Sequence, residues 1–391
     1  MLNTEFSPWP SFTKEEAEAV TQVLLSNKVN YWTGTEGREF EKEFAAFSDS
    51  RYAIAVSNGT VALDLALKAL DIGPGDEVIV TSRTFLASVS SVVNAGAKPV
   101  FADVDPISQN ITADSIKPVI TKHTKAVICV HLAGWPCDMD AITSLAKEDG
   151  LYVIEDCAQA HGAMYKGRSV GSIGHIGAWS FCQDKIMTTA GEGGMVTTND
   201  EQLWSKMWSY KDHGKSWNAV YEREHPQGFR WLHESFGTNW RLTEMQSAIG
   251  RIQLKKMACW HTKRVANANK ILDVAKNLSG LRVPDLPANI EHAWYKCYVF
   301  VDNESLKSDW SRDKIIYEIA ERGVPCFSGS CSEVYLEKAF DNTEFRPKER
   351  LPIAKLLGEI SLMFLVHPTL TEQEISKTCA VLDEVMHLAT S

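Results

Sequence analysis

The chain has 391 residues, of which 44% are hydrophobic, so it is long enough for two domains and a large buried core. This composition excludes disordered and fibrous classes of protein. Its formal net charge of −10 opposes nonspecific attraction to nucleic acid or to an anionic membrane surface, so neither is an expected partner.

The nine cysteines are scattered and form no C-x-x-C pair. The two closest, Cys326 and Cys331, have no nearby histidine, which is a poor spacing for zinc, so no metal site is predicted. The N-terminus has neither a basic start nor an apolar core, and no apolar run approaches the roughly 18 residues of a membrane span. We therefore expect a cytoplasmic protein with reduced thiols and no membrane partner.

The first predicted element is a helix over residues 13–26, because Thr13-Lys-Glu-Glu16 has the form of a capping box and apolar residues follow at helical spacing. From residue 50 onward, short β-rich runs alternate with longer helical runs. Seven strands are predicted, at residues 52–56, 77–80, 99–101, 126–131, 152–155, 178–181 and 195–198.

The first five of these runs are almost continuously apolar, which is typical of strands in a sheet that helices cover on both faces. The pattern predicts an α/β fold with a mainly parallel seven-stranded sheet between helices. Only a loop separates the last two strands, and it carries Lys185 and the run Gly191-Glu-Gly-Gly194. Those glycines indicate a backbone that lies close to another group.

After Arg241 the pattern changes to long helices, the first predicted over residues 242 to 260. A few strands follow, and the last helix begins at the capping-box sequence Thr371-Glu-Gln-Glu374. We predict a large α/β domain over residues 1–258, which includes the N-terminal helix, and a smaller C-terminal α+β domain over residues 259–391.

The motif Ser57-Asn-Gly-Thr60 follows the first predicted strand and opens a helix. Its backbone N–H groups and the Thr60 hydroxyl are suited to hold a phosphate, because the positive end of a helix attracts anions. Ser180, at the end of a later strand, is suited to supply a second hydroxyl to the same phosphate. An ordinary helix cap is the competing interpretation of the motif.

Asp156 ends an apolar strand, where open α/β sheets place ligand-binding residues. A nucleotide hydrolase would use such a carboxylate on magnesium, but its phosphate loop is missing. The one Gly-Lys-Ser, at residues 214–216, has Ser209 where the first glycine belongs, and no strand precedes it. The glycines between residues 171 and 177 have the wrong spacing for a dinucleotide fingerprint, so NAD binding is not predicted either.

Lys185 taken alone is an ordinary surface lysine. A lysine amine can, however, condense with an aldehyde cofactor, and a buried carboxylate such as Asp156 can keep the ring nitrogen of that cofactor protonated. A phosphate cradle, a strand-end carboxylate and a loop lysine together match what pyridoxal 5'-phosphate (PLP) requires. Phe85 is suited to stack on the ring, although an aromatic residue there is by default a core residue. His161 is either a structural histidine or a substrate contact.

Eight motifs, in order across residues 30–370, resemble those of the DegT/DnrJ/EryC1/StrS family of PLP-dependent sugar aminotransferases. The resemblance implies PLP-dependent transferase fold type I, a homodimer with shared active sites at the subunit interface, and PLP as the cofactor. The motifs are Ser57-Asn-Gly-Thr60, Gly73-Pro-Gly-Asp-Glu-Val-Ile-Val80, Ala97-Lys-Pro-Val-Phe101, Val130-His-Leu-Ala-Gly134, Glu155-Asp-Cys-Ala-Gln-Ala-His-Gly162, Gly177-Ala-Trp-Ser-Phe181, Gly191-Glu-Gly-Gly194 and Asn239-Trp-Arg-Leu-Thr-Glu-Met-Gln246.

Carried onto this chain, the resemblance assigns two catalytic residues. Lys185 is the lysine that bonds to PLP and later acts as the general base, and Asp156 is the partner of the pyridine nitrogen. Phe85 would stack on one face of the cofactor ring, and Gln159 would lie on the other.

The resemblance also assigns the phosphate ligands. Gly59, Thr60 and Ser180 would hold the phosphate, and Asn239 would reach it from the neighbouring subunit. The segment 216–236 looks longer than in many members of the family, and the sequence assigns no role to its residues.

The implied reaction transfers an amino group from L-glutamate to a nucleotide-linked keto-deoxysugar, with C4 of the sugar favoured over C3. Synthesis of cell-surface polysaccharide or of a secondary-metabolite sugar is the implied purpose. A cyclitol (keto-inositol) aminotransferase shares every motif and stays open. A PLP-dependent keto-sugar dehydratase carries His in place of the lysine, so Lys185 argues against that alternative.

Overall fold

The computed structural model describes residues 6–390. Its centre is a seven-stranded sheet in the order β1-β9-β8-β5-β4-β2-β3, in which every neighbouring pair is parallel except the two that involve β9. This architecture confirms the predicted mainly parallel α/β fold. The strands are β1 (Tyr52–Val56), β2 (Glu77–Thr81), β3 (Lys98–Ala102), β4 (Thr124–Val130), β5 (Tyr152–Asp156), β8 (Ile176–Ser180) and β9 (Gly194–Thr198).

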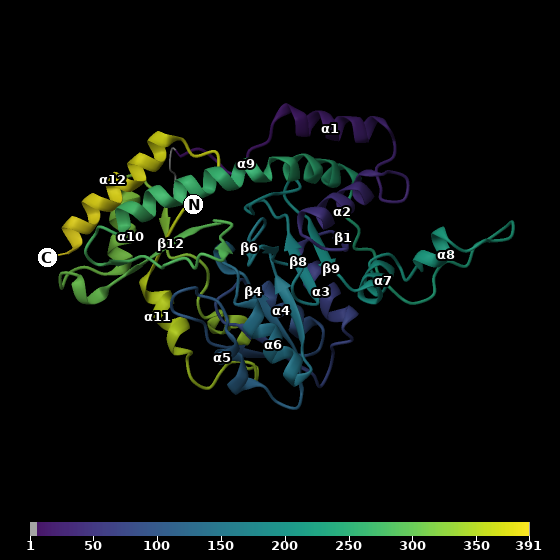
Figure 1. The fold of residues 1–391 in the computed structure, drawn as a ribbon, viewed down its shortest axis with the longest axis horizontal. Coiled ribbons are helices and arrows are strands. Elements are labelled where there is room, and N and C mark those ends of the chain that lie inside the picture. Colours follow the sequence, from purple (N-terminus) through teal and green to yellow (C-terminus); the bar gives the residue numbers. More distant parts are fainter. Residues whose placement is uncertain (1–5, 391) are drawn as a thin grey trace.

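Strand β4 explains why the apolar runs are continuous. Its residues Ala126 and Ile128 pack on one side of the sheet, and Val127 and Cys129 pack on the other, so both sets are buried. Helices cover both faces, as Figure 1 shows. One face carries α3 (Gly59–Ala69), α4 (Ala87–Asn94) and α7 (Glu201–Tyr210), and the other carries α2 (Glu36–Phe47) and α6 (Met139–Asp149), with the short α5 (Ala113–Ile116) beside α6.

Helix α9 (Glu244–Ala275) joins the large sheet to the C-terminal region. Its 32 residues give a length of about 48 Å, and it runs across the molecule in Figure 1 from α1 (Lys14–Leu25) to α12 (Glu372–Ala389). The prediction that this helix ends near residue 260 was wrong. No Gly or Pro interrupts residues 261–275, and their apolar side chains pack into a second core.

That second core belongs to the C-terminal region, which has an antiparallel sheet in the order β10-β12-β14-β13. The predicted domain boundary between residues 258 and 259 falls inside α9, and the division into two domains stays a prediction. The elements here are β10 (Leu281–Arg282), β12 (Cys297–Val301), α10 (Arg312–Glu321), β13 (Cys326–Phe327), α11 (Pro352–Ile360) and β14 (Ser361–Phe364). A small sheet in the order β11-β6-β7 comprises β11 (Ile290–Glu291), β6 (Met164–Tyr165) and β7 (Arg168–Ser169).

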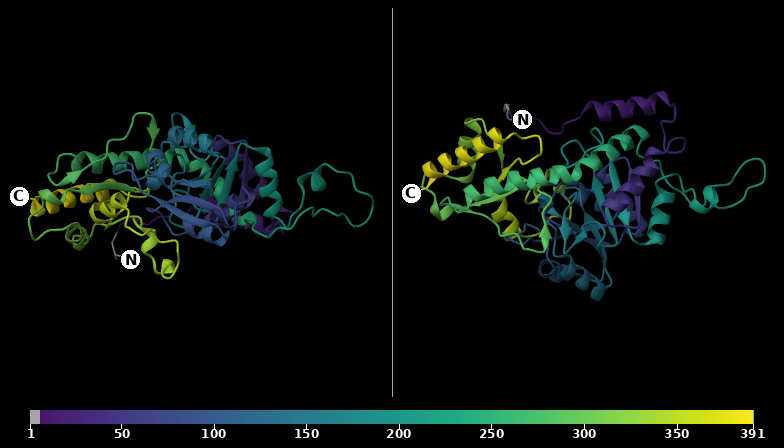
Figure 2. Two further views of the ribbon diagram at one scale, coloured as in Figure 1. Left: turned by 90° about the horizontal axis from the view of Figure 1, so that it is seen from below. Right: turned by 45° about the horizontal axis from the view of Figure 1, so that its top comes forward.

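Residues 215–238, which we call the arm, extend away from the rest of the molecule in all the views of Figures 1 and 2. The arm contains the short helix α8 (Trp217–Tyr221), and the backbone bond from the Ser216 N–H to the Leu232 carbonyl joins its two halves. Three of its aromatic side chains are largely exposed, namely Phe229 (74%), Trp231 (79%) and Phe236 (99%). Among the helices of residues 6–390, each is too short or too polar to cross a membrane.

Candidate active site

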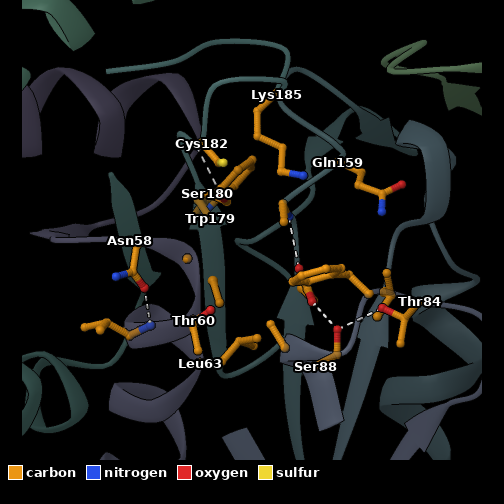
Figure 3. A pocket seen from close by; sticks show the side chains of 18 of the residues that line it. Asn58, Thr60, Leu63, Thr84, Ser88, Gln159, Trp179, Ser180, Cys182 and Lys185 are labelled. Atoms are coloured by element: carbon orange, nitrogen blue, oxygen red, sulfur yellow. Dashed lines mark hydrogen bonds between the residues drawn. The ribbon is translucent and has the colours of Figure 1, made fainter. Parts of the chain in front are cut away.

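A cavity of about 650 Å³ lies at the carboxyl ends of β4, β5 and β8, beside the N-terminus of α3 (Figure 3). Open α/β sheets place ligands at this edge. Seven of the eight residues that the sequence assigned to the cofactor line it: Gly59, Thr60, Phe85, Asp156, Gln159, Ser180 and Lys185. Residues from four separate stretches of sequence therefore meet in one cavity.

The N-terminus of α3 forms one wall of the cavity. The Asn58 side chain caps the helix by accepting a bond of 2.9 Å from the Val61 N–H, which leaves the N–H groups of Gly59 and Thr60 without partners inside the helix. Ser180 of β8 lies against this turn, and a Cβ on Gly59 would be 2.6 Å from the Ser180 Cβ. The turn thus supplies two N–H groups and two hydroxyls at the positive end of a helix, a donor set that fits a phosphate.

Asp156 lies at the floor of the cavity and is buried. Its Oδ2 accepts a bond of 2.8 Å from the Ser88 hydroxyl, and its Oδ1 accepts one of 3.1 Å from the Ala158 N–H. Burial raises the pKa of Asp156, although both hydrogen bonds and nearby Lys185 pull it down. A buried carboxylate held in this way fits a protonated pyridine nitrogen, because each charge then relieves the cost of burying the other.

Sequence reasoning missed Ser88 as the residue that orients Asp156. Ser88 lies in the first turn of α4, and its hydroxyl also bonds to that of Thr84 at 2.8 Å. Ser88 and Asp156 are 68 residues apart, and a serine at the start of a helix carries no sign of so distant a contact. Only the packing of α4 against the carboxyl edge of the sheet brings the two together.

Lys185 extends from the loop between β8 and β9 into the cavity, as Figure 3 shows. Its amine nitrogen, Nζ, lies 3.4 Å from Oδ1 of the adjacent Asp184, and its side chain is only 18% exposed. The loop is closed at its base by a backbone bond of 2.8 Å from the Phe181 N–H to the Gly193 carbonyl. The lysine is therefore held in the cavity and is not a solvated surface residue.

Phe85 and Gln159 complete the cavity wall. The Phe85 ring is 71% exposed, which excludes the alternative that it is an ordinary core residue of the isolated chain. Gln159 is nearly buried, and its side-chain oxygen accepts a bond of 2.8 Å from the Ala133 N–H. Their roles on the two faces of the cofactor ring stay a prediction.

His161 is fully buried between Trp179 and Phe181 and is not among the residues that line the cavity. Burial lowers the pKa of His161 to about 3, so its ring is neutral. Neither ring nitrogen has a hydrogen-bond partner within residues 6–390. This placement favours the structural interpretation of His161 over a substrate contact.

Asn239 differs from the other seven predicted residues because it does not line the cavity of its own chain. It is exposed at the base of the arm, where it pairs with Asp212 in an isolated β-bridge. The expectation that Asn239 serves a neighbouring subunit stays a prediction.

A buried group of His131, Glu155 and Cys157 has the donor atoms of a metal site, but hydrogen bonds already account for its carboxylate. Glu155 bonds to the His131 ring at 3.0 Å and accepts from the N–H groups of Gly171 and Gly174. These contacts tie β5 to the turn before β8, which is a structural role.

Comparison with known proteins identifies the family and the fold. The sequence pattern of the DegT/DnrJ/EryC1/StrS aminotransferase family matches residues 10–383. The chain belongs to this family. It is 34% identical to GDP-perosamine synthase from Escherichia coli O157:H7, with 96% of each chain covered. It is 36% identical to UDP-N-acetyl-3-dehydro-alpha-D-glucosamine 3-aminotransferase from Acidithiobacillus ferrooxidans, with 99% of this chain and 97% of the relative covered.

Solved structures agree with this assignment. An aminotransferase from Psychrobacter cryohalolentis is 68% identical and superposes with a TM-score of 0.96 over 98% of this chain and 100% of that one. DesV from S. venezuelae is 33% identical, with a TM-score of 0.85 over 95% of this chain and 94% of that one. The protein is thus a PLP-dependent aminotransferase of fold type I, as the motifs predicted. The donor set of the cavity fits the phosphate and the ring nitrogen of that cofactor.

Proposed function

We propose that this aminotransferase moves an amino group from L-glutamate to the keto group of a nucleotide-linked deoxysugar, with C4 favoured over C3. The observation that carries the proposal is the single cavity in which Lys185, Asp156 and the α3 phosphate cradle meet. The choice of substrate class rests on relatives such as GDP-perosamine synthase and dTDP-3-amino-3,6-dideoxy-alpha-D-galactopyranose transaminase, whose names specify nucleotide sugars.

The phosphate cradle, Asp156 and Lys185 have distinct tasks in the proposed reaction. PLP, when bound, supplies an aldehyde that bonds to an amine and a ring that withdraws electrons. The α3 N-terminus and the hydroxyls of Thr60 and Ser180 hold the phosphate, and Asp156 holds the proton on the ring nitrogen. Lys185 is first the nucleophile and then, once the donor has displaced it, the base that removes the proton from the donor Cα through Nζ.

We also propose that two copies of the chain share their active sites. Asn239 is exposed at the base of an arm that projects from the molecule, and three aromatic side chains of the arm are largely exposed. An extended arm of this kind buries little of its own apolar surface, and a second copy would cover it. Asn239 would then enter the cavity of the partner.

Absorbance spectroscopy tests the reaction. Purified protein saturated with PLP should show the visible band of a PLP–lysine bond, lose it on addition of L-glutamate, and recover it with a nucleotide-linked keto-sugar. Product NMR would then distinguish amination at C4 from amination at C3. If the band responds to glutamate and to keto-inositol, but to no keto-sugar nucleotide, the protein is instead a cyclitol aminotransferase.

The Lys185→Ala variant is the matched control. It should keep the phosphate cradle and bind PLP without the visible band of a lysine adduct, because the amine is gone. We expect its aminotransfer to fall by at least roughly 10² to 10⁴-fold, the usual worth of a positioned acid or base. An unchanged visible band in this variant would show that another amine bonds to the cofactor.

A further inference from the structure

Two residues outside the family motifs, Asp184 and Tyr295, lie close to the reactive amine of Lys185. Asp184 precedes Lys185, and its Oδ1 lies 3.4 Å from the lysine Nζ. The other carboxylate oxygen, Oδ2, accepts a hydrogen bond from the hydroxyl of Tyr295. Tyr295 lies 111 residues further along the chain, just before β12 of the C-terminal region, so this contact joins the two parts of the molecule.

The charges in this group favour an ionised carboxylate between two donors. The Asp184 side chain is 59% exposed, so solvent weakens its attraction to the lysine amine. Loss of part of its hydration tends to raise the pKa of Asp184, but Lys185 and the Tyr295 hydroxyl outweigh this effect, so the pKa lies below its usual value. Burial and the adjacent Asp184 raise the pKa of Tyr295 well above its ordinary range, so its hydroxyl stays protonated and remains a donor. Asp184 is therefore anchored at Oδ2 and free at Oδ1 to attract the amine.

The Tyr295 ring also contacts the lysine directly. Nζ of Lys185 lies 5.3 Å from the centre of the ring, within the range of a cation–π contact. Tyr295 is nearly buried and belongs to the aromatic core around Phe181 and Trp179, which fixes its position. A single rigid side chain thus touches the lysine amine with its ring and anchors the neighbouring carboxylate with its hydroxyl.

The backbone of Lys185 is held separately. The Trp9 indole N–H donates a bond of 2.7 Å to the Lys185 carbonyl oxygen, and Trp9 packs edge-on against Trp260 of α9 at 5.1 Å. With the backbone fixed, rotation of the long side chain is the remaining freedom of the lysine. Ordering a lysine side chain costs conformational entropy, so contacts that hold its amine raise the fraction of time that the amine points into the cavity.

We propose that Asp184 and Tyr295 are positioning residues, which hold the Lys185 amine in the cavity whenever it is not bonded to the cofactor. The lysine is in that state before PLP binds covalently and again after the donor amine has displaced it. The proposal rests on the assignment of Lys185 as the PLP lysine, and it adds no covalent step to the reaction.

The rate at which the cofactor-free protein bonds to added PLP tests this proposal, because that assay contains neither donor nor sugar. Tyr295→Phe keeps the ring and removes the hydroxyl, and Asp184→Asn keeps the shape and removes the charge. We expect the visible band to form about tenfold more slowly in each variant, since a displaced reacting group costs one to two orders of magnitude in rate. Affinity for pyridoxamine phosphate should be unchanged, because that compound lacks the aldehyde and tests only the cradle and Asp156.

Tyr298→Phe is the matched control. Tyr298 is another largely buried tyrosine three residues further on, and its hydroxyl bonds to the Ser330 N–H at 2.8 Å instead of to Asp184. Its band should form at the wild-type rate. Wild-type rates in both test variants would overturn the positioning role but leave the proposed function standing. A parallel loss of pyridoxamine phosphate affinity would also overturn the positioning role, because it would indicate general damage to the cavity. A wild-type protein that forms no band would instead overturn the assignment of Lys185, and with it the proposed function.

Discussion

Burial of the Asp156 carboxylate lowers the stability of the protein, although its proposed task in the reaction requires a buried carboxylate. Its carboxylate is buried, with partners on both oxygens, and burial raises its pKa. Its hydrogen bonds and nearby Lys185 offset only part of the cost of burying the carboxylate, so the cofactor-free protein bears the remainder.

The pH dependence of stability follows from the sign of this shift. Because the folded pKa of Asp156 is raised, its contribution to the free energy of unfolding is fully present below the unfolded pKa of about 3.9 and is lost as pH rises through the folded pKa. Asp156→Asn should therefore raise the melting temperature of the cofactor-free protein at neutral pH, and the gain should shrink as pH falls toward about 4. Aminotransfer should drop about 100-fold or more.

Thermal unfolding across this pH range, measured without PLP, checks the prediction. Asp64→Asn is a suitable control, because burial raises the pKa of Asp64 to about 6 although it does not line the cavity. The control should be stabilised in the same direction and keep the visible band with PLP. A melting temperature of Asp156→Asn below that of the wild type at neutral pH would contradict our account.

At the scale of elements, the close approach of α3 to β8 creates the phosphate cradle. Both Gly59 of α3 and Gly194 of β9 lie where a side chain would collide, since a Cβ on Gly194 would be 2.4 Å from the Asn58 carbonyl oxygen. The hydroxyl of Ser180 and the first N–H groups of α3 meet only because these positions carry no side chain. The glycines thus permit the close packing on which the proposed phosphate site depends.

Gly59→Ala tests this packing. The added Cβ would lie 2.6 Å from the Ser180 Cβ, so we expect a loss of about 1–3 kcal/mol in the free energy of unfolding, as for other overpacked sites. PLP affinity should fall as well, because α3 and Ser180 must separate. Denaturant unfolding and PLP titration measure the two effects. Gly73→Ala, where the nearest atom would be 3.7 Å away, should change neither, and equal effects at both glycines would count against the cradle.

At the scale of the whole molecule, the exposed aromatic side chains of the arm have no role within a single chain that the fold explains. Phe229, Trp231 and Phe236 are exposed on a segment that extends into solvent in Figures 1 and 2. Exposed aromatic groups of this kind mark interaction surfaces. Asn239 follows the arm directly in the chain, so an arm that contacts a second copy would also bring Asn239 near that copy.

Replacing Phe229, Trp231 and Phe236 of the arm by Ser should shift the protein from dimer to monomer in sedimentation experiments. The change removes apolar surface that we expect the partner to bury, at about 25 cal/mol for each Å². Tyr317→Ser, which alters an exposed aromatic on α10, is the control and should leave the dimer intact. A dimer of undiminished affinity in the triple variant would show that the arm does not hold the two copies together.

How far the sequence predicts the site depends on how local each contact is. The capping turn at residues 57–60, the strand-end Asp156 and the loop with Lys185 are each local patterns, and the structure brings them into one cavity. Ser88, Asp184 and Tyr295 were not predicted, because their contacts depend on how separate elements pack. A serine, an aspartate or a tyrosine in isolation carries no signal of such a contact.

The sequence by itself determined the fold class, because strand periodicity and helix caps are properties of neighbouring residues. Its ordered motifs indicated the family and, through that resemblance, seven residues that meet in the cavity. Tertiary structure alone decided the rest. It extended α9 through Ala275, buried His161 away from the cavity, and placed Tyr295 beside Asp184. These outcomes depend on which surfaces pack together, and burial and distance, unlike periodicity, are set only when the whole chain has folded.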